Sequence, residues 1–181
     1  MVQKRDVAIV GIHEYPSRDV EGEVSPLQIK AASAKQALND AGLEWSDVDA
    51  IYDAGEAGGM AGLNIAEYFG LNPSVIDTTG VGGSSYEFHA AHARRDIAAG
   101  RAKVALLTYG STAHSNAMAI GVGGRGGGAM HPADNMDAYS GMTLVANYAM
   151  VAHRHMHNYG TTSEQLAEIS VATRYHAMRN P

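Results

Sequence analysis

Short apolar runs recur along the chain and are separated by amphipathic stretches. Four runs, at residues 7–12, 50–52, 74–78 and 104–109, are rich in β-forming residues and predict buried strands. Stretches with helical spacing of apolar residues lie between consecutive runs. The resulting βαβαβαβ order predicts an α/β fold, with a mostly parallel sheet and helices packed on both of its faces.

Capping residues and glycines mark the ends of the predicted helices. Ser25 and Pro26 begin one helix, because serine caps a helix start and proline suits its first turn. That helix is expected to end at Gly42. Two further helices are predicted at residues 63–69 and 86–99, each followed directly by a glycine.

The pattern changes beyond residue 109. Residues 110–137 are rich in glycine and show no periodicity, so we expect a long loop that is functional or packs against another subunit. Two closing helices are predicted at about 142–158 and 161–179. The second is expected to start from a capping box over residues 161–164.

Composition and charge exclude several classes of protein. The 181 residues carry a formal net charge of −6, which disfavours nucleic acid and anionic membranes as main partners. No apolar run approaches the ~20 residues of a membrane span, and we expect a cytoplasmic protein. The sequence has no cysteine, so disulfides and thiolate chemistry are excluded within it.

Residues 80–85 form a glycine-rich bend, here called the elbow, between the third apolar run and the 86–99 helix. Such a bend brings backbone N–H groups and the positive end of the helix dipole up to a ligand. Ser84 and Ser85 lie at the helix start. Either they cap the helix, or one of them is a nucleophile or a ligand of an acyl oxygen, which requires a base within reach.

The elbow also resembles a dinucleotide-binding fingerprint, but imperfectly. Ser85 replaces the third glycine of that fingerprint, and the strand at 104–109 is not followed by an acidic residue for a ribose. A dinucleotide-dependent oxidoreductase is therefore the weakest of the hypotheses considered.

Nine histidines raise the question of a metal site. His89 and His92 are three residues apart, and His153 and His157 are four apart, so each pair can share a helix face. Neither pair has the HExxH pattern and no third ligand is evident, so we expect surface or interface histidines instead of a metal site. His89 and His92 are also expected to lie too far along their helix to reach Ser85.

An ordered series of short motifs runs through nearly the whole chain. Its members are residues 7–12, 37–43 with 47–49, the elbow with its helix to 100, 104–110, 139–143, 159–167, His176 and 180–181. Each motif alone is weak, but the series in this order resembles the first half of a thiolase, of the sterol-carrier-protein type found in thiolase-like and lipid-transfer proteins.

This resemblance implies two similar βαβαβαββ halves with a loop region inserted after the first. Residues 1–112 would form the first half, and residues 113–181 the insert with two closing helices. Thiolases carry a cysteine at the elbow that attacks an acyl-CoA thioester, and the matching position here is Gly83. Members without that cysteine include retro-aldolases that shorten steroid side chains as CoA thioesters, with a small OB-fold partner subunit.

The resemblance thus predicts an enzyme that acts on an acyl-CoA thioester, by acyl transfer or by making or cleaving a C–C bond. The alternative is a non-catalytic subunit that binds acyl-CoA or serves as a scaffold. Coenzyme A would enter as part of the substrate, and no permanently bound cofactor is expected. Because half of such a fold leaves apolar surface uncovered, we expect a homo-oligomer or a complex with a partner subunit.

Six residues are the candidates for the site. Ser84 and Ser85 are the catalytic candidates, and Gly82 and Gly83 are expected to leave room for the thioester. By resemblance alone, Tyr139 and Met142 would cover the acyl or pantetheine arm.

Overall fold

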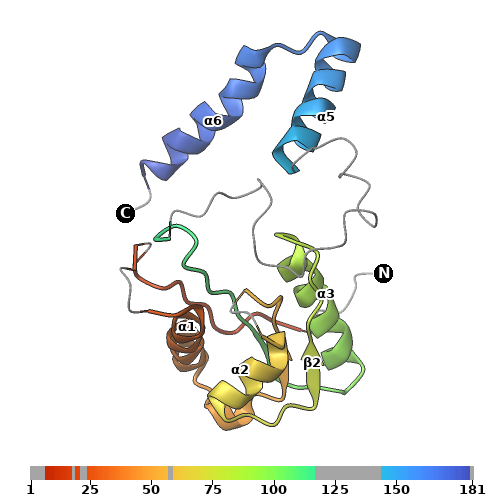
Figure 1. Ribbon diagram of the computed structural model, residues 1–181. Coiled ribbons are helices and arrows are strands. Elements are labelled where there is room, and N and C mark those ends of the chain that lie inside the picture. The colour runs from red at the N-terminus through yellow and green to blue at the C-terminus, as the bar shows by residue number, and fades with distance from the viewer. Residues whose placement is uncertain (1–6, 18, 21–23, 57–58, 117–143, 180–181) are drawn as a thin grey trace. The chain divides into compact units, whose positions relative to one another are not determined.

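The computed structural model describes residues 7–17, 19–20, 24–56, 59–116 and 144–179. The chain divides into two compact units, Met1–Ala117 and Met118–Pro181. In the first unit the elements follow the order α1, η1, β1, α2, β2, α3, β3, and the second holds α5 and α6 (Figure 1). The domain boundary expected between residues 112 and 113 stays a prediction.

Three parallel strands form the sheet of the first unit. Its strands are β1 (Ala50–Tyr52), β2 (Val75–Asp77) and β3 (Ala105–Leu107), in the order β2-β1-β3. Ile51 pairs with Ile76 on one side and with Leu106 on the other. Successive strands of a parallel sheet need crossover connections. Helix α2 connects β1 to β2, and the later helix α3 connects β2 to β3. The predicted α/β class with a parallel sheet is therefore confirmed.

Helices α1 (Pro26–Ala41) and α2 (Ala61–Phe69) cover one face of the sheet. Their apolar residues form a buried cluster with the strand residues that point to this face. The members of this cluster are Ala34, Leu38, Val48, Ile51, Ile65, Ala66 and Leu106. Helix α2 also approaches β2 closely, because a Cβ at Gly62 would lie 2.4 Å from the Ile76 side chain.

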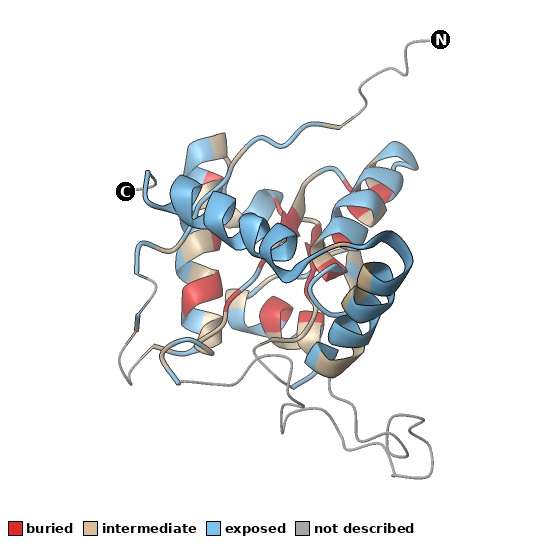
Figure 2. Ribbon diagram, turned by 90° about the horizontal axis from the view of Figure 1, so that it is seen from above, coloured by how far each residue is buried: buried red, intermediate tan, exposed pale blue. Residues whose placement is uncertain are grey.

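Helix α3 (Ser85–Ala98) covers the opposite face. Ala50 and Tyr52 point to this side, since successive residues of a strand alternate between the two faces. They form a second buried cluster with Ala93 and Ala102. Buried positions are drawn red in Figure 2. The prediction that helices pack on both faces is thus confirmed.

The helix ends follow the local signals. Ser25 accepts a hydrogen bond from the amide of Gln28, whose side chain binds back to the amide of Ser25, as a capping box requires. Gly42 and Gly70 end α1 and α2 in the left-handed conformation. In α6 (Ser163–Ala177) the cap lies one residue later than expected, at Thr162 with Gln165. Helix α5 spans Leu144–Tyr159.

The strand predicted at residues 7–12 is wrong, because this described segment has no regular structure. The end of the segment contacts α1 instead of a neighbouring strand. Ile12 N–H donates to Asp40 Oδ2 at 3.1 Å, and a Cβ at Gly11 would lie 2.0 Å from the Ala37 carbonyl oxygen. Ile9 is consequently 87% exposed despite its β-forming sequence context.

Among the described helices, none is long and apolar enough to span a lipid bilayer.

Candidate functional site

The carboxyl ends of the three strands and the elbow lie at one edge of the sheet in the first unit. Asp53 directly follows β1, Thr108 follows β3, and β2 ends at Asp77 before the elbow begins. In open parallel sheets this edge is where ligands generally bind, because the following loops and helix starts converge there.

The elbow is open on its outer side. Gly82 has a φ of +75°, in the left-handed region that glycine adopts without strain. A Cβ built at Gly82 or Gly83 would meet no atom of the described residues within 4 Å. Both glycines are exposed, as are Val81 and Ser84. The expected free space beside the helix start is therefore present.

The two serine candidates sit in different environments. Ser85 is fully buried, and its Oγ accepts from the Val81 amide at 2.9 Å and donates to the Gly82 carbonyl at 2.5 Å. Ser84 is the N-terminal flanking residue of α3 but makes no capping hydrogen bond, so the capping interpretation is wrong for it. Their assignment as catalytic residues stays a prediction.

The elbow is held by hydrogen bonds of its own. The Ser85 amide donates to the Gly82 carbonyl at 3.0 Å, and the Val81 amide donates to the Ser85 hydroxyl. Val81 and Gly83 also form an isolated bridge. The amides of Gly83 and Ser84 belong to exposed residues. They lie at the start of α3, where the helix dipole adds positive partial charge, so they suit an oxyanion.

The segment that leads into the elbow is fixed by side chains from α3. Asp77 accepts hydrogen bonds from the amide and hydroxyl of Thr79, at 2.8 and 2.7 Å, and pairs with His92 at 2.7 Å. Burial pushes the pKa of Asp77 up, but these partners outweigh burial and hold its pKa below the ordinary value. His89 Nε2 lies 2.9 Å from the Thr79 carbonyl oxygen and donates to it, since a carbonyl only accepts.

The position of His89 differs from the one expected from the sequence. His89 was expected at the surface or at an interface, but it is fully buried and contacts the rings of Tyr52 and Tyr86. Its Nδ1 has no hydrogen-bond partner among the described residues. His92 is partly buried. Neither histidine bonds to Ser85 among the described contacts, consistent with the expectation that they lie too far along the helix.

A charged cluster is buried beneath the same edge of the sheet. The Lys30 ammonium, fully buried on α1, is paired with Asp53 and lies 2.9 Å from Glu56. Asp53 also accepts from the Gly55 amide at 2.8 Å and from the Thr108 hydroxyl at 3.4 Å. One cation therefore faces two carboxylates, and these partners offset the cost of removing Lys30 from water.

Glu56 connects this cluster to the helix that starts at the elbow. Its second carboxylate oxygen accepts a hydrogen bond from the Tyr86 hydroxyl, in the first turn of α3. Burial alone would raise the pKa of Glu56, but the hydrogen bonds from Tyr86 and Lys30 outweigh it and lower the pKa. Burial and the Glu56 carboxylate both raise the pKa of the Tyr86 hydroxyl, so Tyr86 stays protonated and donates.

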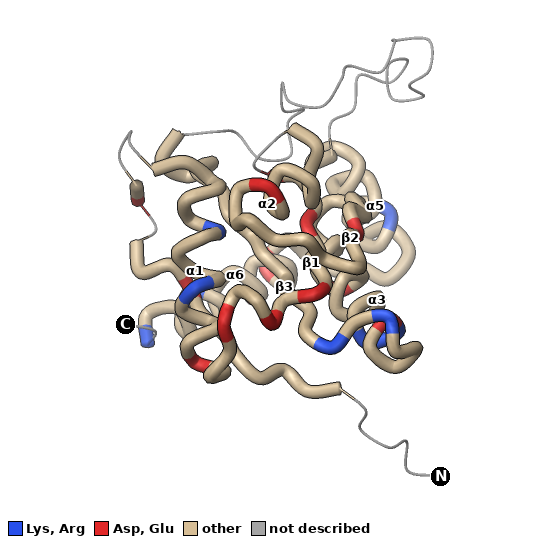
Figure 3. The backbone as a smooth tube through the Cα atoms, turned by 90° about the horizontal axis from the view of Figure 1, so that it is seen from below, with Lys and Arg blue, Asp and Glu red and all other residues tan. Residues whose placement is uncertain are grey.

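Exposed basic residues lie at the other end of α3 (Figure 3). Arg94 and Arg95 are in its last turns, and Arg101 follows it and pairs with Asp96. Cations at a helix C-terminus complement the dipole there.

Sequence reasoning missed Lys30, Asp53 and Glu56. Two signals were available in retrospect. Lys30 lies on the apolar line of α1, three residues after Leu27 and four before Ala34, where a lysine is unexpected. Asp53 directly follows a fully buried strand. Tyr139 and Met142 lie outside the described residues.

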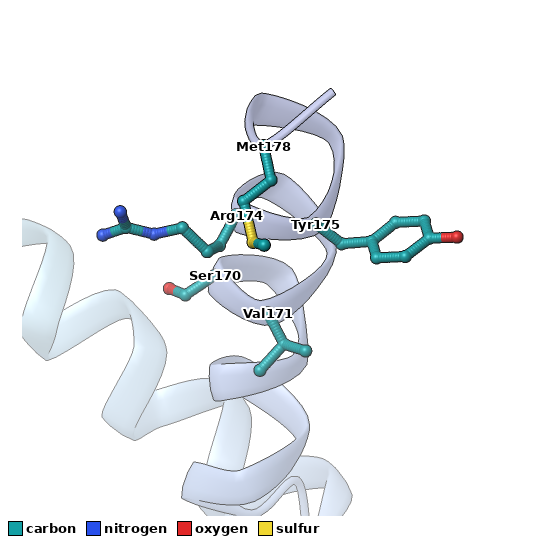
Figure 4. Close-up of a pocket in the computed structure, with 5 residues that line it drawn as sticks. All are labelled: Ser170, Val171, Arg174, Tyr175 and Met178. Carbon is teal, nitrogen blue, oxygen red and sulfur yellow. The ribbon is translucent and has the colours of Figure 1, made fainter. Parts of the chain in front are cut away.

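A separate hollow of about 420 Å³ lies along α6 in the second unit. Figure 4 shows its lining side chains, which all come from this one helix: Ser170, Val171, Arg174, Tyr175 and Met178. These residues are exposed, so the hollow is a helix surface and not an enclosed site. Within the described ranges, no three histidine, aspartate or glutamate side chains gather as metal ligands would.

Comparison with known proteins gives a consistent set of similarities. No model of a known protein family matches the sequence. The chain is 30% identical over 191 residues to an acetyl-CoA acetyltransferase of Methanothermobacter thermautotrophicus, covering 98% of the chain and 46% of that protein. It is also 30% identical to a steroid side-chain-cleaving aldolase of Thermomonospora curvata, covering 97% of the chain and 45% of that protein.

A solved structure agrees with these sequence similarities. The structure named Ltp2-ChsH2(DUF35) aldolase superimposes with a TM-score of 0.73 and 27% identity, covering 96% of this chain and 44% of that one. The chain spans about half the length of the relatives it matches. It is therefore similar, over nearly all of its own length, to about half of a protein named acetyl-CoA acetyltransferase and to about half of proteins named as aldolases.

Proposed function

We propose that this chain forms part of an enzyme that cleaves or forms a C–C bond beside the thioester of an acyl-CoA, by aldol chemistry and without a covalent acyl-enzyme. The open elbow carries the proposal: an unhindered bend, exposed residues at a helix start and no thiol. Similarity to two proteins named as aldolases supports it. Acyl transfer, which the acetyltransferase relative suggests, would need a different nucleophile at the elbow.

The elbow amides suit the charge that this reaction develops. In the cleavage direction a base removes the proton of a β-hydroxyl, and the O–H electron pair becomes the π bond of a new carbonyl. The Cα–Cβ bond breaks, and its electron pair moves onto the thioester as an enolate, which then takes up a proton at Cα. The products are a ketone or aldehyde and a shorter acyl-CoA.

The proposed role of this chain is to bind the thioester oxygen. The amides of Gly83 and Ser84 would donate to that oxygen as it becomes negative, and the dipole of α3 adds to the stabilisation. Removing one donor from such a site typically reduces kcat by about 10²–10³-fold. A buried elbow would not allow this role, whereas the observed elbow faces outward.

A partner subunit is part of the proposal. The structural neighbour is named with a second component, ChsH2(DUF35), and we propose a comparable small partner, of OB-fold type by resemblance, for this chain. A homo-oligomer and an acyl-CoA substrate complete the proposed assembly.

Gly83 allows a sharp test. Its φ is not in the left-handed region and a Cβ there would contact nothing, so Gly83→Ala should leave the free energy of unfolding nearly unchanged. The added methyl group would project into the space proposed for the thioester. We therefore expect Gly83→Ala to weaken acyl-CoA binding and cleavage by tenfold or more, measured by calorimetry and by release of the carbonyl product.

The controls separate the hypotheses. Purified protein, with any subunits that co-purify, is assayed on β-hydroxyacyl-CoA thioesters, with NAD as a control ligand. Binding without conversion in every combination would favour the non-catalytic binding subunit. If Gly83→Ala leaves turnover unchanged, the elbow does not take part in the reaction.

A further inference from the structure

Tyr86 is the point at which three loops at the carboxyl edge of the sheet meet. Its hydroxyl donates to Glu56 in the loop after β1. Its ring contacts Tyr109, in the loop after β3, edge-on with 5.4 Å between ring centroids. Tyr86 itself belongs to the first turn of α3, directly after the elbow. Its side chain therefore ties the start of α3 to the loops on both sides.

Lys30 on α1 supports this arrangement through ion pairs. Its ammonium is fully buried on α1 and reaches Glu56 Oε2 at 2.9 Å and Asp53. The loop after β3 packs directly on its alkyl chain, since a Cβ at Gly110 would lie 2.7 Å from Lys30 Cγ. A buried ammonium needs its carboxylates within reach, so Lys30 fixes the place of Glu56, and Glu56 fixes the Tyr86 hydroxyl.

The two carboxylates that pair with Lys30 differ in their burial and in their partners. Asp53 is fully buried and shared among Lys30, Thr108 and the Gly55 amide. Glu56 keeps 21% of its side chain exposed and, among the described residues, bonds to Lys30 and Tyr86. Glu56 thus links Lys30 on α1 to the first turn of α3.

We propose that Lys30, Glu56 and Tyr86 are positioning residues of the acyl-CoA site, which set the first turn of α3 and thereby aim the elbow amides at the thioester oxygen. This inference rests on the proposed function. It assigns no proton transfer to these groups. Their effect is geometric, and in a positioned site a displacement of about 1 Å can reduce the rate by about 10²-fold.

The chain contains a matched control for this idea. Tyr52 donates to Asp96 at 2.8 Å, so the first unit has a second buried pair of tyrosine and carboxylate. Asp96 lies in the last turns of α3, at the opposite end of the helix from the elbow. Tyr52→Phe should therefore reduce stability without changing the geometry of the elbow.

The experiment compares Tyr86→Phe, Glu56→Gln, Glu56→Ala and Tyr52→Phe in the full protein with its co-purifying subunits. Values of kcat and KM for a β-hydroxyacyl-CoA are normalised to the folded fraction, which is measured by circular dichroism. We expect Tyr86→Phe to lower kcat by about 10–100-fold with KM changed less than threefold. We expect Tyr52→Phe to keep both constants within twofold while lowering the unfolding midpoint.

The two substitutions at residue 56 give a graded readout. Glutamine still accepts the Tyr86 hydroxyl hydrogen bond, whereas alanine does not. Glu56→Gln should therefore retain several-fold more kcat than Glu56→Ala at equal folded fraction. If Tyr86→Phe fails to fold, the comparison of Glu56→Gln with Glu56→Ala by itself tests the positioning inference.

The outcomes of the two proposals are distinguishable. If the unmodified protein cleaves acyl-CoA but Tyr86→Phe and Glu56→Ala keep kcat within twofold, the positioning inference is overturned and the proposed function stands. If the unmodified protein neither binds nor converts any acyl-CoA, the proposed function fails and the positioning inference fails with it.

Discussion

Ser84 and Ser85 are neighbours with the same side chain, but their surroundings differ completely. Ser85 is buried with both hydrogen-bonding functions of its hydroxyl in use, whereas Ser84 is exposed and makes no capping bond. The sequence placed both at the start of a helix and could not separate them. The difference depends on which hydroxyl points back into the elbow, and this is set by the backbone path at Gly82.

Replacement of Ser85 should therefore cost more than replacement of Ser84. Ser85→Ala removes the part-buried acceptor of the Val81 amide, and the loss of such a hydrogen bond typically reduces the free energy of unfolding by about 0.5–1.5 kcal/mol. Ser84→Ala should change it by less than about 0.5 kcal/mol. Urea denaturation of both variants measures this, and equal losses would contradict the hydrogen bonding described for the elbow.

Asp77 should make the free energy of unfolding depend on pH in the acidic range. Its folded pKa is lowered, so its contribution is fully present above the unfolded value near 3.8 and is lost as the pH falls through the folded pKa. The free energy of unfolding should decrease with falling pH in that window. Asp77→Asn should flatten the decrease, and parallel curves for the two proteins would show that Asp77 does not cause it.

Among the elements, those with strong local end signals were predicted most closely. The strand at 50–52 and the end of α1 before Gly42 match the structure, and the predicted helix at 86–99 is shifted by one residue. The segment 7–12 was predicted as a strand from composition alone, and it is wrong. A strand needs a partner with free backbone groups, and the amide of Ile12 is engaged by Asp40 on α1 instead.

The two capping boxes provide a prediction about the helices. Ser25→Ala should lower the free energy of unfolding by about 0.5–2 kcal/mol, because α1 carries buried core residues. Thr162→Ala removes the equivalent cap from α6, which has no buried residue. We expect it to reduce helical circular dichroism with a smaller change in the cooperative unfolding transition. A larger effect from Thr162→Ala would indicate that α6 is packed more strongly than described.

The whole molecule presents much apolar surface. In the described part of the chain, large apolar side chains are exposed on the 7–12 segment and along both α5 and α6. They include Ile9, Ile12, Leu144, Val151, Tyr159, Ile169 and Met178. Exposed apolar side chains in such numbers usually mark interaction sites.

This surface predicts association. In size-exclusion chromatography with light scattering, the isolated 19.0 kDa chain should elute above its monomer mass or require a co-purifying subunit. It should also bind an apolar fluorescent dye, and a partner should suppress that binding. A sharp monomer peak with cooperative unfolding and no dye binding would refute the prediction.

By itself, the sequence determined the α/β class, the approximate limits of most elements and the open glycine elbow, because capping, apolar periodicity and glycine conformation act over a few residues. Only the tertiary structure decided that Lys30, Asp53, Glu56 and Tyr86 meet beneath the elbow and that His89 is buried. The four residues that meet come from two helices and the loop after β1, and they lie up to 56 positions apart in the chain. Their contacts depend on how parallel strands bring distant loops to one edge of the sheet, and no local pattern encodes that arrangement.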